Sequence, residues 1–120
     1  MFEIKKTAEQ VSFELISHAG NSKSCSMEAM AAADQGNYEL VDLKLKEADD
    51  ELGQAHRAQT DLLTDFARGE KIEVDVLLVH AQDHLNGAIL TYDFAKKVIS
   101  LTRRVQALEE KVSRIDQDVR

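Results

Sequence analysis

Two histidines on one predicted helix are the first residues in this sequence that could do chemistry. His80 and His84 are four residues apart in the segment LLVHAQDHL. Residues at this spacing lie on one face of an α-helix, so the two imidazoles share a side. Such a pair is typical of zinc sites, but the metalloprotease version has a glutamate directly after the first histidine. Ala81 stands at that position, so the general base of a metalloprotease is missing.

The residues needed for other reaction types are absent or far apart in the chain. A nucleophilic triad requires serine or cysteine beside a histidine, and Cys25 and Ser22 belong to an earlier part of the sequence. The sequence also contains no glycine-rich phosphate-binding loop. A histidine therefore remains as the candidate nucleophile, because a neutral imidazole nitrogen can accept a phosphoryl group and release it again. Such a histidine needs exposure on one side, an orienting partner and hydrogen-bond donors near the phosphate.

The elements that position these residues are predicted to be three helices. The 120-residue chain has no proline, and its Ala, Leu, Glu, Lys and Gln content favours an all-α domain. Glycine-containing turns at 34–37 and 68–71 divide it, and short turns of this kind join antiparallel helices. We therefore predict an up-down-up three-helix bundle with helices at about 4–34, 38–67 and 73–117. Residues 72–76 alternate like a strand, but we interpret them as the start of the third helix because no partner strand is evident.

Antiparallel pairing about the second turn predicts which residues lie near the histidines. It places His80 level with Gln59 and His84 level with His56, so Gln82 and these three side chains are the expected supporting groups. Three other interpretations stay open. His80 can be an ordinary core histidine, the three histidines can bind zinc, or His56 and Gln59 can simply satisfy each other. His18 is expected in the core or near the surface, and Cys25 in the core.

An acidic residue interrupts an apolar stripe on the same helix. A buried, unpaired carboxylate is costly, so Asp83 is expected to be protonated, paired or exposed to solvent. If the stripe lies on an oligomer axis, several copies of Asp83 come together and require a proton or a cation between them. The stripe consists of Val76, Val79, Asp83, Gly87, Leu90 and Phe94.

The end of the third helix has a heptad pattern with valine at a and leucine or isoleucine at d. Because residues beyond about 103 have no neighbour in their own chain, this apolar seam predicts self-association. We therefore divide the chain into a three-helix domain at 1–103 and a coiled-coil extension at 104–120. The seam consists of Val98, Leu101, Val105, Leu108, Val112, Ile115 and Val119.

The charge distribution restricts the expected partners. The net charge is −7, and residues 1–95 hold 18 acidic and 8 basic side chains. An acidic body of this kind argues against nucleic acid or an anionic membrane as a partner, although residues 96–120 carry 7 basic against 4 acidic side chains. No apolar run is long enough to span a bilayer, and no signal peptide is evident. Cys25 is the only cysteine, so a reducing cytoplasmic location is expected.

Three segments together resemble the enzyme IIA component of the lactose/cellobiose (N,N′-diacetylchitobiose) family of the phosphoenolpyruvate-dependent sugar phosphotransferase system. They are LVHAQDHL at 78–85, AHRAQT at 55–60 and GNSKS at 20–24, and the resemblance covers about residues 10–100. It implies a trimer of three-helix subunits. It further implies that HPr phosphorylates His80 on Nε2, and that the phosphoryl group then passes to a cysteine of a cognate IIB protein that works with a membrane component, IIC. Asp83 matches the family's metal-binding aspartate, three copies of which hold one Mg²⁺.

The sequence departs from this family pattern in two places. Asn86 and Gly87 stand where the family usually has methionine followed by threonine or serine, and the heptad tail is longer than the family leads us to expect. A second hypothesis therefore stays beside the phosphocarrier. The chain can be a non-catalytic helical interaction or regulatory module that keeps the fold and binds a partner through its tail.

Overall fold

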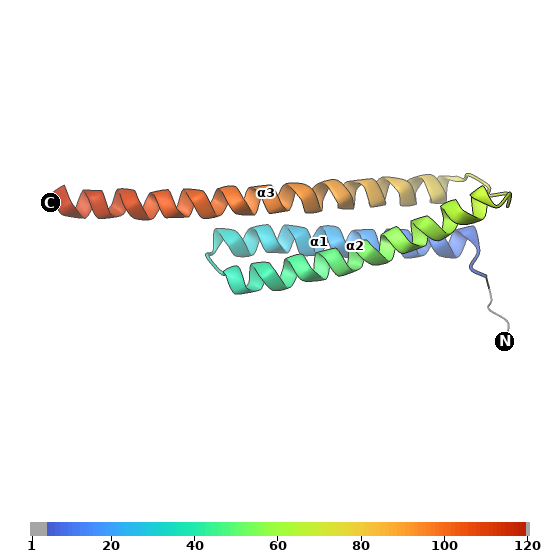
Figure 1. The fold of residues 1–120 in the computed structure, drawn as a ribbon, viewed down its shortest axis with the longest axis horizontal. Helices are drawn as coiled ribbons and strands as arrows, with labels where there is room; N and C mark the ends of the chain where they lie inside the picture. Colours follow the sequence, from blue (N-terminus) through green and yellow to red (C-terminus); the bar gives the residue numbers. More distant parts are fainter. Residues whose placement is uncertain (1–4, 120) are drawn as a thin grey trace.

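The structure is a computed structural model that describes residues 5–119. The described residues form three α-helices and no strand: α1 (Ala8–Asp34), α2 (Tyr38–Ala67) and α3 (Val76–Val119). The helices alternate in direction, and α3 continues past the turn between α1 and α2 as a projecting helix (Figure 1). The predicted all-α, up-down-up architecture is confirmed. None of the three helices contains an apolar stretch that could cross a membrane.

Side-chain caps set where the first two helices begin. Thr7 Oγ1 accepts a hydrogen bond from the Gln10 amide at 3.2 Å, and the Gln10 side chain accepts one from the Thr7 amide at 2.9 Å. α1 therefore begins at Ala8, and the predicted start at residue 4 falls outside the described residues. Asn37 caps α2 through the amide of Leu40 at 3.2 Å, so α2 has the predicted bounds. Gly36 supplies the left-handed turn before it, with φ of 74°.

The third helix begins three residues later than predicted. Asp75 Oδ1 accepts a hydrogen bond from the Leu78 amide at 2.8 Å, which makes Asp75 the cap of α3 and leaves 70–75 as a connecting segment. The alternating pattern that suggested a strand belongs to this segment. Ile72 packs against the core, whereas Val74 is 76% exposed. The prediction that 73–75 form the first helical turn is wrong. The Asp75 carboxylate caps the helix, so the helix begins at the residue that follows it.

Small residues let the helices approach closely around α1. Alanines are fully buried on all three helices, including Ala19, Ala55 and Ala81. α1 contacts both other helices along its length, whereas α2 and α3 contact each other much less. Leu15, which is fully buried, lies in the main core cluster between these elements. The result is two helices packed on a central one, with a hollow between α2 and α3 that Leu62, Phe66 and Leu78 help to line.

The point where α3 leaves the body is marked by contacts with the first turn. Gln106 Nε2 donates to the Ala33 carbonyl oxygen at 2.7 Å, and the Tyr38 hydroxyl donates to Gln106 Oε1. The Arg103 guanidinium stacks over the Tyr38 ring at 4.1 Å. Beyond these residues α3 continues without a break to Val119. The expected exit near residue 103 therefore agrees with the structure, while the division into two domains at 103/104 stays a prediction.

Candidate functional site

The two histidines of α3 lie in direct contact on an accessible flank of the helix. The Nε2 atoms of His80 and His84 are 3.0 Å apart, and the ring centroids are 4.5 Å apart with planes at 79°. The His80 side chain is exposed and that of His84 is half-buried. At this separation one Nε2 carries a proton and donates it to the other. His80 is therefore not a satisfied core histidine, and one of its neighbours is a second imidazole.

The two glutamines form a separate pair on the side of α3 that faces α2. Gln59 Nε2 donates to Gln82 Oε1 at 2.8 Å, and Gln82 Nε2 donates to Gln59 Oε1 at 2.7 Å. Each amide thus satisfies the other, and the pair connects two helices that otherwise contact each other little. Successive helical residues are about 100° apart, so His80 and Gln82 point about 200° apart around α3.

This arrangement corrects the predicted pairing across α2 and α3. The register is right to within two residues, because Gln59 meets α3 close to the expected level. The side is wrong: Gln59 contacts Gln82 and not His80, and His56 is exposed on α2 with no hydrogen bond to His84. Sequence arithmetic along two helices predicts the level of a residue but not the flank that faces its neighbour.

The histidines do not assemble a metal site within one chain. Among the described residues, no group of three or more histidine, cysteine or acidic side chains is close enough to hold an ion. The zinc site suggested for His56, His80 and His84 is therefore not formed. Asp83 is exposed among outward-facing apolar side chains, with Val79 56% and Leu90 47% exposed. One chain therefore offers one carboxylate on this face.

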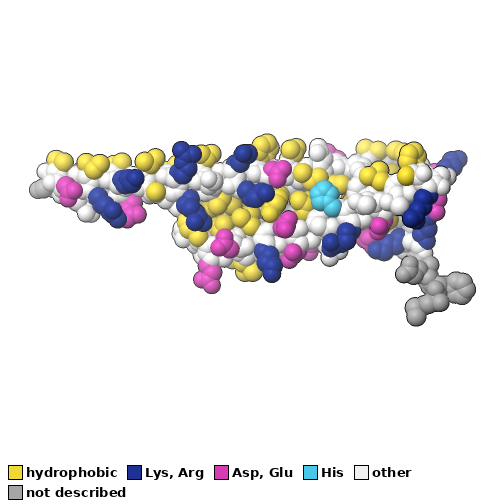
Figure 2. All heavy atoms as spheres, in the orientation of Figure 1, with side chains coloured by type: hydrophobic (Ala, Val, Ile, Leu, Met, Phe, Trp, Pro, Cys, Tyr) yellow, Lys and Arg dark blue, Asp and Glu magenta, His cyan; other side chains and the backbone are white. Residues whose placement is uncertain are grey.

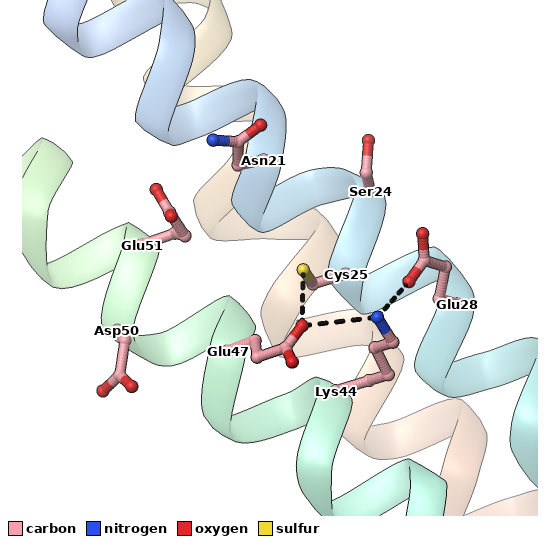
Figure 3. A pocket seen from close by; sticks show the side chains of 8 residues that line it. All are labelled: Asn21, Ser24, Cys25, Glu28, Lys44, Glu47, Asp50 and Glu51. Atoms are coloured by element: carbon pink, nitrogen blue, oxygen red, sulfur yellow. Dashed lines mark hydrogen bonds and ion pairs between the residues drawn. The ribbon is translucent and has the colours of Figure 1, made fainter.

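A polar cavity between α1 and α2 contains Cys25, the residue that was expected in the core. It has a volume of about 400 Å³. Figure 3 shows that Lys44 lines this cavity and forms ion pairs with Glu28 and Glu47. Lys44 Nζ is 2.8 Å from Glu28 and 3.3 Å from Glu47, and these hydrogen bonds raise the pKa of the lysine. Cys25 Sγ lies 3.6 Å from Glu47. Burial first, and then Glu47, raises the pKa of this thiol, so the cavity holds a weakly nucleophilic cysteine.

His18 is paired at the same interface. Its Nδ1 atom is 2.6 Å from Glu51 Oε2, and about one third of each side chain is exposed. His18 therefore lies near the surface, one of the two positions expected. Cys25 is half-buried and not fully in the core. These contacts hold α1 and α2 together, and no periodic pattern predicts them because the contacts between the two helices join residues 16 to 33 positions apart.

Gly87, three residues after His84, has open space beside its backbone. A Cβ atom at Gly87 would have no neighbour within 4 Å, so packing within one chain does not require glycine there. Gly87 lies on the outward stripe next to Leu90, and Asn86 is exposed. The departure from the family pattern therefore affects the outer surface of α3 and not the bundle core.

Comparison with known proteins gives one consistent result. Residues 10–103 match the model of the lactose/cellobiose-specific IIA subunit of the PTS system. The chain is 45% identical over 97 residues to the lichenan-specific phosphotransferase enzyme IIA component of Bacillus subtilis (strain 168), covering 81% of this chain and 88% of that protein. It is 43% identical over 97 residues to the cellobiose-specific EIIA component of Lactococcus lactis subsp. lactis (strain IL1403), covering 81% and 84%.

Solved structures agree with these relatives. The crystal structure of the PTS cellobiose-specific enzyme IIA from Bacillus anthracis superimposes with a TM-score of 0.82 at 42% sequence identity, covering 87% of this chain and 95% of that one. The resemblance seen in the segments around His56 and His80 is thus confirmed. The chain belongs to the lactose/cellobiose-specific IIA family and is a component of the sugar phosphotransferase system.

Proposed function

We propose that His80 is the phosphoryl acceptor of this IIA component. It accepts the phosphoryl group from phospho-HPr on Nε2 and passes it to a cysteine of the cognate IIB protein, which works with a IIC membrane component. The observation that carries the proposal is the exposed His80 imidazole in contact with His84, within a chain of the IIA family. Sugars of the lactose, cellobiose and chitobiose type are the proposed cargo, in keeping with the lichenan, cellobiose and lactose named for its relatives.

The proposed attack implies a tautomer for each of the two imidazoles. Attack on phosphorus requires a lone pair on His80 Nε2, so His80 carries its proton on Nδ1 and His84 donates from Nε2. As the bond from Nε2 to phosphorus forms, the bond from phosphorus to the donor breaks and the hydrogen bond between the imidazoles opens. The Nε2–H group of His84 then lies beside the phosphoryl oxygens and donates to one of them. The return step, to a cysteine sulfur, reverses this exchange.

Phosphorylation of single-residue variants tests the acceptor. Wild-type protein incubated with phosphoenolpyruvate, enzyme I and HPr should take up one phosphoryl group that acid removes and alkali does not. His80→Ala should take up none. His56→Ala is the matched control, because His56 is exposed on α2 without a contact to His80, and it should be labelled like the wild type. An acid-labile, alkali-stable label on His80→Ala would show that another residue is the acceptor.

Replacement of His84 tests whether its imidazole assists phosphoryl transfer to His80. Glutamine keeps a donor at the end of a side chain of similar reach, whereas leucine does not. His84→Gln should therefore retain labelling, and His84→Leu should slow it by about 100-fold, at the lower end of what one hydrogen-bond donor to the transition state contributes. Equal labelling rates for wild type and His84→Leu would remove His84 from the mechanism while leaving His80 as the acceptor.

We also propose that the protein is a trimer in which α3 lies at the threefold axis. The outward stripe of α3 is apolar and exposed in the single chain, and Asp83 is its only acidic member between Val76 and Phe94. Three copies would bring three carboxylates together, and oxygen ligands of this type suit Mg²⁺. The donor set therefore fits a magnesium ion shared between subunits, which would neutralise the carboxylates without taking part in phosphoryl transfer.

A further inference from the structure

The projecting end of α3 presents an apolar face that the body leaves uncovered. Residues 107–119 lie beyond the last contacts with the first turn, and the tail continues about 20 Å at 1.5 Å per residue. Its apolar side chains lie along one edge of the molecule, which Figure 2 shows as a row of hydrophobic atoms over α3. More than half of each is exposed: Val105 51%, Leu108 59%, Val112 64%, Ile115 62% and Val119 83%. A helix of this length is marginal without a partner.

This tail is an addition to the family domain. The family model ends at residue 103, and the heptad seam continues through two further repeats. The body also lies on the other side of the helix, because Ile99 and Gln106 face the first turn while the seam faces away. The seam is therefore available to another molecule along its whole length.

The charges beside the seam identify the occupant. With valine at position a and leucine or isoleucine at d, Arg104 and Lys111 occupy successive g positions, and Glu109 and Asp116 occupy the e positions that follow. In a parallel, in-register coiled coil, each g residue lies beside the e residue five positions later in the neighbouring chain. Arg104 then meets Glu109 of a second copy, and Lys111 meets Asp116. Every such pair joins opposite charges.

The opposite orientation brings like charges together. In an antiparallel coiled coil g residues meet g residues and e residues meet e residues, so Arg104 and Lys111 would oppose each other, and Glu109 would oppose Asp116. Asp118, at the last g position, is the one g residue of the tail that would meet a basic side chain in that arrangement. Among the described residues, Arg104, Glu109 and Lys111 form no ion pair. Arg114 is paired with Glu110 at 2.5 Å on the side of α3 opposite the seam. The side chains of Arg104, Glu109 and Lys111 are thus available for contact with a second molecule.

The surface of the tail also has the shape that a coiled-coil partner requires. A hollow lined by Val105, Leu108 and Val112 runs along the seam, and Glu109 and Asp116 form its border. Side chains of a neighbouring helix insert into hollows of this type in coiled coils. We propose that residues 104–119 are a homotypic assembly element that pairs in parallel and in register with the same segment of another copy of this chain.

This pairing would select copies of the same chain. IIA subunits that lack the tail, or carry other charges at e and g, do not complete the pattern, so the tail favours self-assembly over mixed assembly with a paralogous subunit. The proposal concerns residues 104–119 and is independent of whether His80 is the phosphoryl acceptor. It concerns a later part of the same α3 face than the proposed packing around Asp83, and the two parts can be altered separately.

Charge exchange at one pair of positions tests the proposal in the full-length protein. Arg104→Glu and Glu109→Arg should each raise the dissociation constant of the assembly by roughly 10-fold, measured by sedimentation or mass photometry at low salt. The double variant R104E/E109R should restore the wild-type value, because it exchanges the two charges across the pair. Arg114→Glu makes the same change of charge on the side of α3 opposite the seam. It is the matched control, and the dissociation constant should not change.

Three outcomes would overturn the proposal. Unchanged dissociation for both single variants would show that these positions do not meet in pairs of opposite charge, as in an antiparallel arrangement. Failure of the double variant to recover would show that Arg104 and Glu109 are not partners. Binding of the tail to vesicles of anionic phospholipid, with no loss of self-association in the single variants, would identify a membrane surface as the occupant.

A cross-link gives a second measurement that does not depend on charge. Val112 occupies an a position, and two a residues at one level face each other only in a parallel, in-register pair. Val112→Cys in a Cys25→Ala background should form a disulfide-linked dimer under mild oxidation. Gln117→Cys in the same background occupies an f position, on the side of the helix opposite the seam, and should not. Equal cross-linking of the two variants, or none at Val112, would contradict the parallel register.

Discussion

At the scale of single residues, the chemistry depends on which side of α3 each side chain occupies. His80 and His84 share one flank, Gln82 faces α2 on another, and Asp83 lies on the outward face between them. Four neighbouring polar residues thus have three different environments. The segment HAQDH is compact in sequence, but its members act in different places because successive helical residues turn by about 100°.

Asp83 is expected to act in assembly and not in phosphoryl transfer. Asp83→Leu removes a carboxylate from an apolar face and should preserve or strengthen the proposed trimer, since a buried leucine side chain contributes about 1.5–3 kcal/mol. Light scattering across a dilution series measures the effect. Asp93→Leu removes the same charge beside Lys96, off the stripe, and is the control. Dissociation of Asp83→Leu alone would show that the shared metal ion stabilises the trimer more than the packing does.

Cys25 should react slowly with alkylating reagents. Burial and the nearby Glu47 carboxylate both raise the pKa of its thiol, which lowers the thiolate fraction at pH 8. Glu47→Gln removes the negative charge and should increase the rate of iodoacetamide modification severalfold, measured by mass spectrometry. Glu73→Gln, in the connecting segment, should leave the rate unchanged. A rate in Glu47→Gln equal to the wild type would mean that burial alone protects the thiol.

At the scale of elements, local chemistry decided where helices begin and tertiary contacts decided which surfaces they bury. Thr7, Asn37 and Asp75 each cap the helix that follows, and such caps are recognisable in sequence. The start of α3 was nevertheless predicted three residues early, because the acidic residue before a helix suits both a first turn and a cap. The strand-like alternation at 72–76 reflects a segment that packs Ile72 inward and leaves its other apolar side chains outside.

Glycine inside α1 offers a test of helix energetics. Gly20 lies in the helix interior, and an added Cβ would meet no atom within 4 Å. Gly20→Ala should therefore raise the free energy of unfolding by about 0.5–1 kcal/mol. Gly36 is the control, because its φ of 74° is unfavourable for alanine and Gly36→Ala should lower that free energy by about 1 kcal/mol. Thermal unfolding measures both, and destabilisation by Gly20→Ala would mean that another molecule approaches this point.

At the scale of the whole molecule, the exposed apolar surface points to assembly. Of the large apolar side chains that are exposed, those from Val76 to Val119 follow one face of α3, and the structure extends 74 Å along this direction. Contiguous patches of this size on soluble proteins mark interaction sites. The apolar face of α3 is therefore the part of the surface that the proposed assembly would bury.

The mass in solution tests this conclusion directly. Light scattering of the wild-type protein at micromolar concentration should give three times the chain mass of 13.4 kDa. Burial of the α3 stripe by neighbouring copies is the physical reason, since each buried side chain removes apolar area from water. Tail variants such as Arg104→Glu should lower the mass only on dilution. A wild-type mass of one or two chains would contradict the threefold arrangement and with it the shared position of Asp83.

The features that depend on neighbours along the chain could be predicted from the sequence. The three helices follow from periodic apolar residues and from glycine turns, the heptad seam is read from spacing alone, and the segment around His80 was sufficient to indicate the family. The level at which α2 meets α3 was also predicted closely, because antiparallel helices joined by a short connection keep a fixed register. These features need no knowledge of side-chain packing.

The tertiary structure alone decided which flanks face each other. Packing on α1 turned Gln82 toward Gln59 and left His80 with His84, so the supporting groups form two pairs and not one cluster. The rotation of α3 about its axis depends on how the small residues of three helices fit together, which is a property of the whole core. No local pattern records that rotation, and for this reason the sequence predicted the level of these residues along the helices better than their contacts.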